Sequence, residues 1–503
     1  MKKVKDIFFK IITISFFILF LWITFSGIFT NMEIVYKLKS GMVILGTLIY
    51  IAIAMIIYKT IIPKMRKYKF IKYIIFLGLL ILYISFACYF RLEIKWENSE
   101  EYTWDMGNVF NSSLELAQTG KVQDTYLLTF PNNIMLTLLN AIVLKLALLI
   151  NANVDTIFVI TIYNAIIVWI TILLTYLVAK EIFDDDRANM FLIIAFFTMP
   201  FYFYTPVFYT DTMSMFFLIL MTYLCVKINK CEENSKQKII LQGILGVVSA
   251  IGMKVKLTSI FILIAVSIYI LLTWNWKKAL KSIVGIIPTF IITLVIINIV
   301  SNQLIYYGRD DSTFKVPKLH WIMIGLNENG SFSPEDYTTT MTKPTYEEKE
   351  EAEIQSIKEK ISQYNAKTFL IHLNDKLVFA WGDGTYYGPI KLERMPHKFG
   401  VLHDVVLRYG KYNKYFKYIP QAMHFGMLIF ILINTFFIIK EKRYSKNINI
   451  IFIITICGFL AFLLIWENRS RYVITALPIM LLLEVEGINY LNIKSKRRKE
   501  LEE

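Results

Sequence analysis

The stretch TIFVITIYNAIIVWITILLTYLVAKEI, residues 156–182, is an apolar run with no charge before Lys180. A helix needs about 20 apolar residues to cross the hydrocarbon core of a bilayer, so this run is long enough. Many similar runs follow each other along the 503-residue chain, which is 56% hydrophobic and 18% charged. Soluble domains have about 45–50% apolar and about 25% charged residues. The sequence therefore predicts a polytopic α-helical membrane protein.

Short basic segments between the runs predict the topology. Lys and Arg gather in MKKVK at the N-terminus, at 58–72, 274–281 and 440–446, and in KSKRRK at 494–499. Loops rich in Lys and Arg stay in the cytoplasm, so both termini are expected inside. The net charge of +15 then reflects topology, and membrane lipids rather than nucleic acid are the expected partners.

Spans between two cytoplasmic loops must be even in number, but the apolar runs between residues 72 and 227 are odd in number. The run at 131–150 begins with Pro131 and carries Lys145, and we expect it to be an interfacial or re-entrant helix on the outer side. About twelve spans then remain. They are expected near residues 7–29, 41–61, 70–90, 156–182, 188–204, 212–228, 239–252, 258–273, 283–301, 421–440, 448–466 and 471–490.

Two large polar segments, residues 91–130 and residues 302–420, are expected on the outer side. Residues 302–420 mix Trp, Tyr and Pro with charged residues, which indicates a small folded extracytoplasmic domain, expected to be of α/β type. The expected units are three N-terminal helices at 1–90, an outer loop with the interfacial helix at 91–155, a membrane core at 156–301, the outer domain at 302–420, and three C-terminal helices with a basic cytoplasmic tail at 421–503.

Two carboxylates are expected to share the outer face. Asp211 lies in FYTDTMSMFF at the start of a span, and Asp105 lies in EYTWDMGNVF in the first outer segment. Acidic residues at such depths are costly and usually functional. The alternative is a helix N-cap for either residue, or a solvated loop acid for Asp105.

Four cations also fall on the outer side, where few are expected. Lys254 and Lys256 lie in GMKVKLTS, and Arg469 and Arg471 lie in WENRSRY. Arg binds phosphate in a bidentate manner and Lys acts as a compact charge, so these residues are candidates for holding a lipid phosphate. The alternatives are snorkelling side chains and, for the arginines, pairing with Glu467. The histidines show no metal-ligand spacing, so no histidine-based metal site is expected, and a divalent cation stays open as a cofactor.

Several short motifs occur in an order that resembles one family. They are WDMGN (104–108), FPNNI (130–134), YTDT (209–212), KLTS (256–259), WIMIGLNENGSFSPED (321–336), LVFAWGDGTYYGP (377–389) and ENRSRYVITALPIM (467–480). Together they resemble membrane glycosyltransferases of GT-C type, and among these the family 39-like enzymes related to protein O-mannosyltransferases and aminoarabinose transferases. The resemblance covers most of residues 91–490.

The resemblance implies a GT-C-like fold and a polyprenyl-phosphate-linked sugar donor. Transfer to an acceptor hydroxyl on a glycan, lipid or protein is expected at the outer face of the plasma membrane. It implies Asp105 as the general base, with Asp211 supporting it. Lys256 and Arg471, followed by Lys254 and Arg469, are the candidates for the donor phosphate. The family's Asp-x-Glu pair is missing, because Met106 and Gly107 follow Asp105, which argues against a divalent cation in this loop.

Two other functions stay open. A transporter or flippase for a lipid-linked envelope precursor fits the same composition, although no internal repeat is evident. A structural partner in a cell-envelope complex also fits, and it would tolerate loss of either carboxylate.

Overall fold

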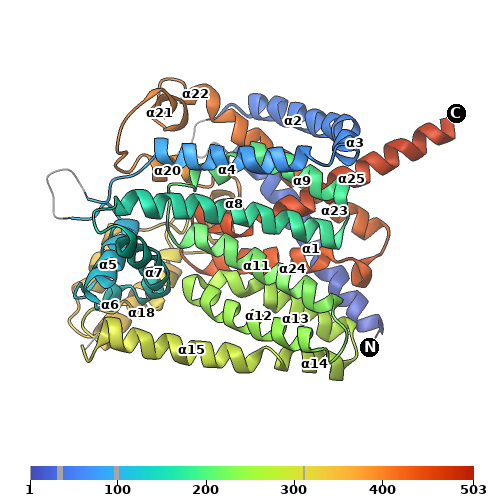
Figure 1. Ribbon diagram of the computed structural model, residues 1–503. Helices are drawn as coiled ribbons and strands as arrows, with labels where there is room; N and C mark the ends of the chain where they lie inside the picture. Colours follow the sequence, from blue (N-terminus) through green and yellow to red (C-terminus); the bar gives the residue numbers. More distant parts are fainter. Residues whose placement is uncertain (1, 31–37, 96–100, 310–311, 503) are drawn as a thin grey trace.

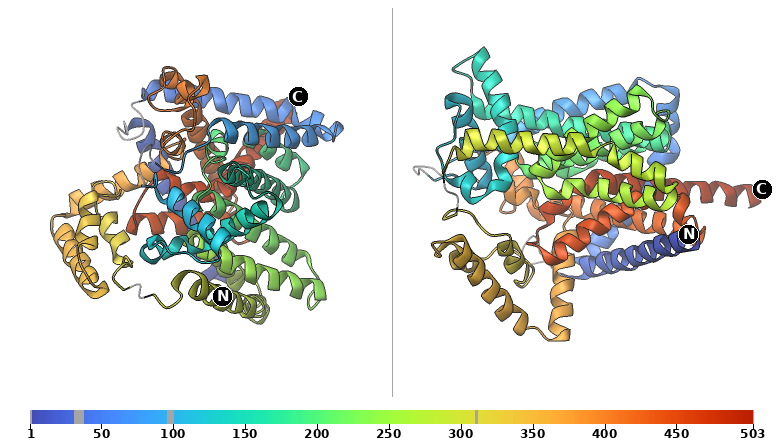
Figure 2. Two further views of the ribbon diagram at one scale, coloured as in Figure 1. Left: turned by 60° about the vertical axis from the view of Figure 1, so that its left-hand side comes forward. Right: turned by 90° about the horizontal axis from the view of Figure 1, so that it is seen from below.

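The computed structural model describes residues 2–30, 38–95, 101–309 and 312–502. Within these residues the chain is helical, and only two isolated β-bridges join extended segments. The long helices run side by side, and both termini lie at one end of the bundle (Figure 1). The opposite end, which carries α5, α6, α7 and α18, is called the distal end below; Figure 2 shows it from two further directions.

The expectation of a polytopic helical membrane protein is confirmed. In the described ranges, ten helices are long and apolar enough to cross a membrane, and two shorter apolar helices accompany them, at 257–273 and 449–465. The long body consists of α1 (Lys2–Phe29), α2 (Ser40–Thr60), α3 (Ile62–Lys67), α4 (Ile71–Tyr89), α8 (Thr156–Ile182), α9 (Asp185–Phe197), α10 (Met199–Phe203), α11 (Thr210–Lys230), α12 (Lys236–Val255), α13 (Phe261–Thr273), α14 (Trp276–Val284), α15 (Ile287–Ser301), α23 (Tyr418–Lys440), α24 (Asn449–Ile465) and α25 (Leu477–Glu502).

Shorter helices build the distal end and its connections. These are α5 (Asp105–Thr119), α6 (Tyr126–Thr129), η1 (Pro131–Asn133), α7 (Ile134–Ile150), η2 (Leu257–Ile260), η3 (Asn302–Tyr306), α16 (Leu319–Gly325), α17 (Pro334–Met341), α18 (Tyr346–Ser362), α19 (Ala366–Trp381), α20 (Gly388–Leu392), α21 (Val401–Val406), α22 (Asn413–Phe416) and η5 (Ser470–Ala476). A further short turn, η4 (Tyr444–Lys446), connects α23 to α24.

One expected span is wrong. Residues 188–204 do not form one helix but break at Thr198 into α9 and α10. The reason is Pro200, which has no N–H group to continue the ladder of backbone hydrogen bonds and therefore opens a new helix.

The run at 131–150 forms η1 and α7 and is apolar enough to count among the ten long helices. Its direction nevertheless differs from theirs. Figure 1 shows α7 nearly end-on at the distal end, while α4, α8 and α15 run across the view. The helix therefore lies across the direction of the long helices, and its interfacial position stays a prediction.

The expected α/β type of the outer domain is wrong for the residues described between 302 and 420. They form the helices α16 to α22, with no strand among them. Local sequence explains this: Thr345 and Glu348 make a capping box at the start of α18, and Asn365 caps α19. The charged residues that follow are helix formers rather than strand formers.

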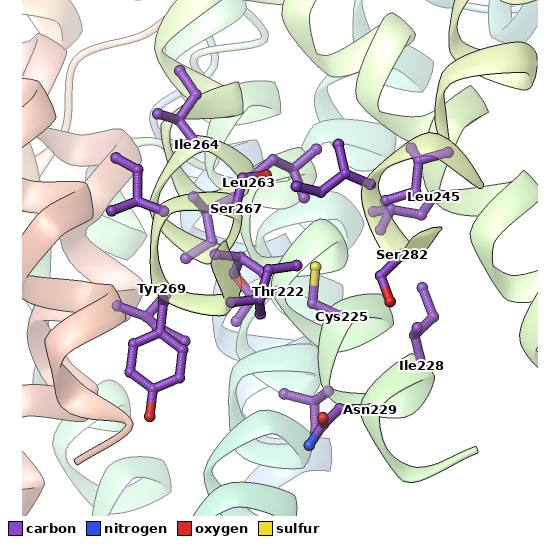
Figure 3. Close-up of a pocket in the computed structure, with 18 of the residues that line it drawn as sticks. Thr222, Cys225, Ile228, Asn229, Leu245, Leu263, Ile264, Ser267, Tyr269 and Ser282 are labelled. Atoms are coloured by element: carbon purple, nitrogen blue, oxygen red, sulfur yellow. The ribbon is translucent and has the colours of Figure 1, made fainter. Parts of the chain in front are cut away.

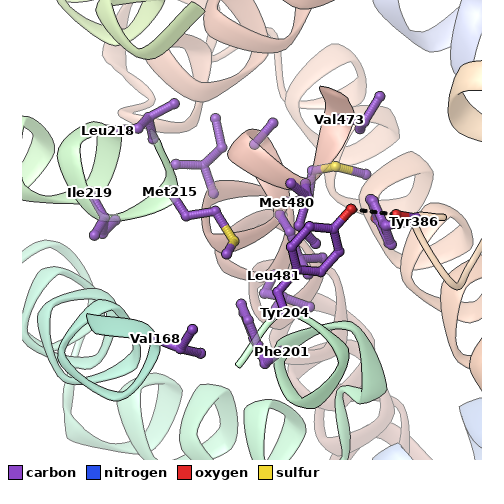
Figure 4. Close-up of a cluster of buried hydrophobic side chains, with 14 of the residues drawn as sticks. Val168, Phe201, Tyr204, Met215, Leu218, Ile219, Tyr386, Val473, Met480 and Leu481 are labelled. Atoms are coloured by element: carbon purple, nitrogen blue, oxygen red, sulfur yellow. Dashed lines mark hydrogen bonds between the residues drawn. The ribbon is translucent and has the colours of Figure 1, made fainter. Parts of the chain in front are cut away.

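The core of the bundle lies where α25 packs against α8, α9, α11 and α23. Figure 4 shows apolar side chains from α8, α10, α11, η5 and α25 meeting around Tyr204, whose hydroxyl donates a 2.7 Å hydrogen bond to the carbonyl oxygen of Tyr386. Lipid tails are as apolar as these side chains, so close dispersion contacts rather than the hydrophobic effect hold such helices together.

A cavity of about 780 Å³ opens among α11, α12, α13 and α15. Its wall is mostly apolar, with Thr222, Cys225 and Ser282 among the few polar groups (Figure 3). The charged residues singled out in the sequence lie elsewhere, at the distal end.

Candidate functional site

A second cavity, of about 640 Å³, lies at the distal end between α5, α6, α20, η2 and η5. Four of the six predicted site residues line it: Asp105, Lys256, Arg469 and Arg471. These residues are far apart in the sequence, so the cavity exists only because the helix ends that carry them meet at one place.

Asp105 is the first residue of α5 and is partly exposed to the cavity. Its helix start favours a negative charge, because the unpaired N–H groups of the first turn carry a partial positive charge. The close packing of this turn requires Gly107, since a Cβ atom there would lie 2.6 Å from the carbonyl oxygen of Ile94. The WDMGN motif therefore builds a tight platform for the carboxylate.

Three further side chains fix Asp105 through a chain of hydrogen bonds. Tyr126 donates to Oδ1 of Asp105 at 3.1 Å, and Nδ2 of Asn133 donates to the Tyr126 hydroxyl at 2.7 Å. Tyr209 in turn donates to Oδ1 of Asn133 at 3.1 Å. The FPNNI and YTDT motifs thus contribute Asn133 and Tyr209 to the same network.

Asp211 lies behind the cavity wall, with 1% of its surface exposed, and it does not line the cavity. Its Oδ1 accepts a 2.5 Å hydrogen bond from Nζ of Lys256, and its Oδ2 lies 3.6 Å from Nη1 of Arg471. Tyr209, not Asp211, is the N-cap of α11. Asp211 therefore serves as the buried counter-ion of two cations of the cavity.

Lys254 does not belong to this group. It lies in the last turn of α12, is exposed, and donates a hydrogen bond to Oδ1 of Asn298 at 3.4 Å. The two lysines of GMKVKLTS point in different directions because α12 ends at Val255 and the backbone turns extended at Lys256. The prediction of Lys254 as a phosphate ligand gains no support from this position.

The ENRSRY motif contributes three charged groups and a tyrosine. Glu467 accepts a hydrogen bond from Nε of Arg469 at 3.3 Å and from the Tyr472 hydroxyl at 2.7 Å. Arg471 donates from Nη2 to the Tyr472 hydroxyl at 3.2 Å, but its Nε and Nη1 have no hydrogen-bond partner although the residue is buried. Two of the three nitrogens of this guanidinium group therefore lack a hydrogen-bond acceptor, and they form its unoccupied edge.

The WGDGTYYGP motif contacts Arg469 and its neighbour Ser470. Asp383 accepts hydrogen bonds from the backbone N–H and hydroxyl of Thr385, and from the Ser470 hydroxyl at 2.7 Å. The same carboxylate accepts from the N–H of Tyr387, whose hydroxyl receives Nη1 of Arg469 at 2.9 Å. Asp383 thus holds the loop before α20 against η5.

Lys391 and Arg394 also line the cavity and were not predicted from the sequence. Nζ of Lys391 lies 3.4 Å from the centroid of the Trp104 ring, and Cζ of Arg394 lies 5.8 Å from it. Burial, together with the nearby Arg471, lowers the pKa of Lys391 well below its usual range. Their segment, KLERMPHK at 391–398, is basic on the expected outer side, and that signal was available in the sequence.

The remaining wall is rich in aromatic rings from residues 321–337 and from the end of α24, including Trp321, Phe332, Tyr337, Phe462 and Trp466. His320 joins them, and its Nδ1 lies 2.8 Å from the Thr340 hydroxyl, which donates to Glu353 at 3.0 Å. The cavity thus combines an aromatic side with a charged side.

The charged side is positive overall. Lys256, Lys391, Arg394, Arg469 and Arg471 stand against the carboxylates Asp105, Asp211 and Glu467. Among the described residues, no group of three His, Cys, Asp or Glu side chains is placed to hold a metal ion. Such a site suits an anionic ligand next to a carboxylate.

Two solved structures illustrate the similarities in overall shape. The oligosaccharyltransferase AglB from Archaeoglobus fulgidus, in complex with an inhibitory peptide and a dolichol-phosphate, is 14% identical, with a TM-score of 0.42 over 86% of this chain and 52% of that one. ArnT from Cupriavidus metallidurans, in the apo state, is 10% identical, with a TM-score of 0.33 over 82% of this chain and 76% of that one. The chain spans about half the length of the oligosaccharyltransferase.

Sequence comparison gives the family. No protein of curated function matches the chain. Residues 3–490 match the family described as conserved hypothetical integral membrane protein, and the chain therefore belongs to this family of integral membrane proteins.

Proposed function

We propose that this protein is a membrane glycosyltransferase that moves a sugar from a polyprenyl-phosphate-linked donor to an acceptor hydroxyl at the outer face of the plasma membrane. The acceptor is a cell-envelope glycopolymer, a glycolipid or a protein. One observation carries the proposal: the partly exposed Asp105 carboxylate opens into the same cavity as five cationic side chains. The motif order that resembles GT-C enzymes supports it.

The chemistry needs a base and an anion site. Asp105 accepts the proton of the acceptor hydroxyl, and the hydroxyl oxygen attacks the anomeric carbon of the sugar. The bond between that carbon and the phosphate oxygen breaks, its electron pair stays on the phosphate oxygen, and the lipid phosphate leaves. A single displacement inverts the configuration at the anomeric carbon.

The side chains around Asp105 fit these roles. The Tyr126 hydroxyl, itself fixed by Asn133, holds the carboxylate in one orientation. Cations in the cavity stabilise the charge that develops on the leaving phosphate. Asp211 orients Lys256 and Arg471 toward that position without contacting the substrate. Asp211 is accordingly proposed as a positioning residue rather than a catalytic one.

The test is a comparison of cells that lack the gene and are complemented with wild-type protein or with Asp105→Asn. The variant should reach wild-type levels in the membrane but leave one envelope sugar missing and its lipid-linked donor accumulated. Mass spectrometry of envelope glycans and of extracted lipid-linked sugars measures both. Asp404→Asn, an exposed acid on α21 outside the cavity, is the matched control and should behave as wild type.

Normal envelope glycans in cells that carry only Asp105→Asn would contradict the transferase. They would favour the transporter or the structural partner, neither of which needs a base at this position.

A further inference from the structure

We propose that Lys391, Arg394 and the unoccupied edge of Arg471 form an oxyanion subsite of the cavity that takes the phosphate group of a lipid phosphate. The inference rests on the proposed function, which it refines by naming the cations that meet the phosphate. It differs from the sequence-based choice of Lys256 as a leading ligand.

Charge pairing separates the five cations of the cavity into two groups. Lys256 is neutralised by Asp211, and Arg469 is paired with Glu467. Lys391 and Arg394 line the same cavity, and among the described residues neither makes an ion pair or a side-chain hydrogen bond with a carboxylate. Arg471 lies 3.6 Å from Asp211 but keeps Nε and Nη1 without a hydrogen bond. Lys391 and Arg394 therefore lack a carboxylate partner, and Arg471 shares Asp211 with Lys256 while two of its nitrogens lack a hydrogen-bond acceptor.

The burial of these groups makes the missing partners significant. Lys391 is 4% exposed and Arg471 is 9% exposed. Burying a cation without a carboxylate partner reduces stability, and a cation–π contact offsets only part of that loss. The contact of Lys391 with Trp104 thus compensates only part of the cost. An arrangement of this kind reduces stability, and it is typical of a site that awaits a ligand of opposite charge.

The neighbouring rings of Trp104 and Tyr209 contact the three cations. Lys391 and Arg394 lie on it, while Arg471 lies 5.9 Å from the ring of Tyr209, which packs edge-on against Trp104 at 5.2 Å. Two guanidinium groups and one ammonium group provide planar, bidentate donors and a compact charge, which is the donor set suited to phosphate oxygens.

The charge of the subsite also fits the reaction. A phosphodiester donor carries one negative charge, and the phosphate monoester that leaves carries nearly two at neutral pH. Two cations without carboxylate partners therefore interact more strongly with the departing phosphate than with the bound donor. Interactions that strengthen along the reaction are those that accelerate it. Because Trp104 directly precedes Asp105, the subsite and the base are attached to the same helix start.

The experiment measures binding by the purified full-length protein in detergent, without any transfer reaction. Thermal unfolding is recorded with polyprenyl phosphate, with inorganic phosphate, and with the uncharged polyprenol as a control for the tail. A ligand that binds only the folded state raises the unfolding temperature in proportion to the logarithm of its concentration over Kd. Wild-type protein should be stabilised by polyprenyl phosphate and not by polyprenol.

Lys391→Met and Arg394→Gln should each weaken polyprenyl phosphate binding at least tenfold. Without ligand, Lys391→Met should be as stable as wild type or more stable, because it removes a buried amine that has no carboxylate partner. Lys391→Arg should retain most of the binding. Lys254→Met removes an exposed lysine outside the cavity and is the matched control, which should bind as wild type.

The two phosphate probes separate the sources of the anion. Loss of stabilisation by both probes in Lys391→Met supports a subsite for the phosphate group alone, and loss with polyprenyl phosphate only supports a headgroup subsite that needs the lipid tail.

Wild-type affinity in both Lys391→Met and Arg394→Gln would overturn the inference, as would a Lys391→Met protein that is markedly less stable than wild type without ligand. Such a result would leave the transferase standing if Asp105→Asn is inactive. Conversely, if the wild-type protein binds polyprenyl phosphate through these cations but Asp105→Asn is still active, the subsite stands and only the proposed reaction is contradicted.

Discussion

The ammonium group of Lys256 donates a 2.5 Å hydrogen bond to Oδ1 of Asp211, and the carboxylate that accepts it is 1% exposed. The pair joins the start of α11 to the junction of α12 and η2, and Arg471 brings η5 to the same carboxylate. Three segments that are distant in the sequence are therefore held together by one buried negative charge.

Asp211→Asn should destabilise the protein by about 3–5 kcal/mol, because it leaves two buried cations without their counter-ion. Thermal unfolding of the purified protein in detergent measures the loss. Adding Lys256→Gln to the variant should recover a good part of it, since the uncompensated ammonium group is then gone. If Asp211→Asn unfolded at the wild-type temperature, Asp211 would not be the counter-ion that joins these helix ends.

Tyr126→Phe should lower the rate of transfer about tenfold while polyprenyl phosphate binds as before. The hydroxyl donates to the charged Asp105, and hydrogen bonds to charged groups contribute about 1.5–3 kcal/mol. The loss should fall on kcat rather than on KM for the donor, because Tyr126 orients the base. An increase in KM alone would assign Tyr126 to substrate binding instead.

Two neighbouring buried groups, His320 on α16 and Glu353 on α18, have opposite effects on stability as the pH changes. Burial raises the pKa of Glu353 to about 7, and burial lowers the pKa of His320 to about 4. The contribution of Glu353 is present below its unfolded pKa, near 4.5, and is lost as the pH rises to about 7. The contribution of His320 is present above its unfolded pKa, near 6.5, and is lost as the pH falls to about 4. Between these limits the two trends oppose each other.

Single substitutions should therefore expose one trend at a time. Glu353→Gln should make the unfolding temperature rise with pH between about 4 and 6.5, while His320→Asn should make it fall between about 4.5 and 7. The double variant should show neither trend beyond the background slope of the protein. Identical pH profiles for both single variants would refute the opposing titrations.

Cysteine labelling tests the membrane orientation. Ser331→Cys, in the outer helical region, should react with a membrane-impermeant maleimide in intact cells. The native Cys231, in the loop between α11 and α12, should react only after permeabilisation and serves as the internal control. Labelling of position 331 only after permeabilisation would reverse the proposed orientation.

The apolar runs predicted most of the helices well, because crossing a bilayer forces the backbone to satisfy its own hydrogen bonds within each run. The error at 188–204 came from Pro200, whose local effect was outweighed in the prediction by the length of the run. The α/β expectation for residues 302–420 rested on composition, whereas the capping residues Thr345 and Asn365 were a better guide to its helices.

Among the site residues, the sequence singled out Asp105 and Arg471 from their positions on the expected outer face, and the cavity brings them together. The resemblance ranked Lys256 ahead of Lys254, and of the two only Lys256 lines the cavity, because α12 ends at Val255 and the backbone turns extended at Lys256. The prediction missed Lys391, whose significance lies in a contact with Trp104 from a distant part of the chain.

The sequence by itself determined that the chain is an integral membrane protein, roughly where its helices lie, and which carboxylates and cations are candidate site residues. These properties are local, since hydropathy and charge act along the chain against the bilayer. Only the tertiary structure decided that Asp211 is a buried counter-ion, that Asp105 opens into the cavity, and that Lys391 and Arg394 stand there without carboxylate partners. Pairing between charges depends on distances of a few ångströms, and only the packing of helix ends sets those distances.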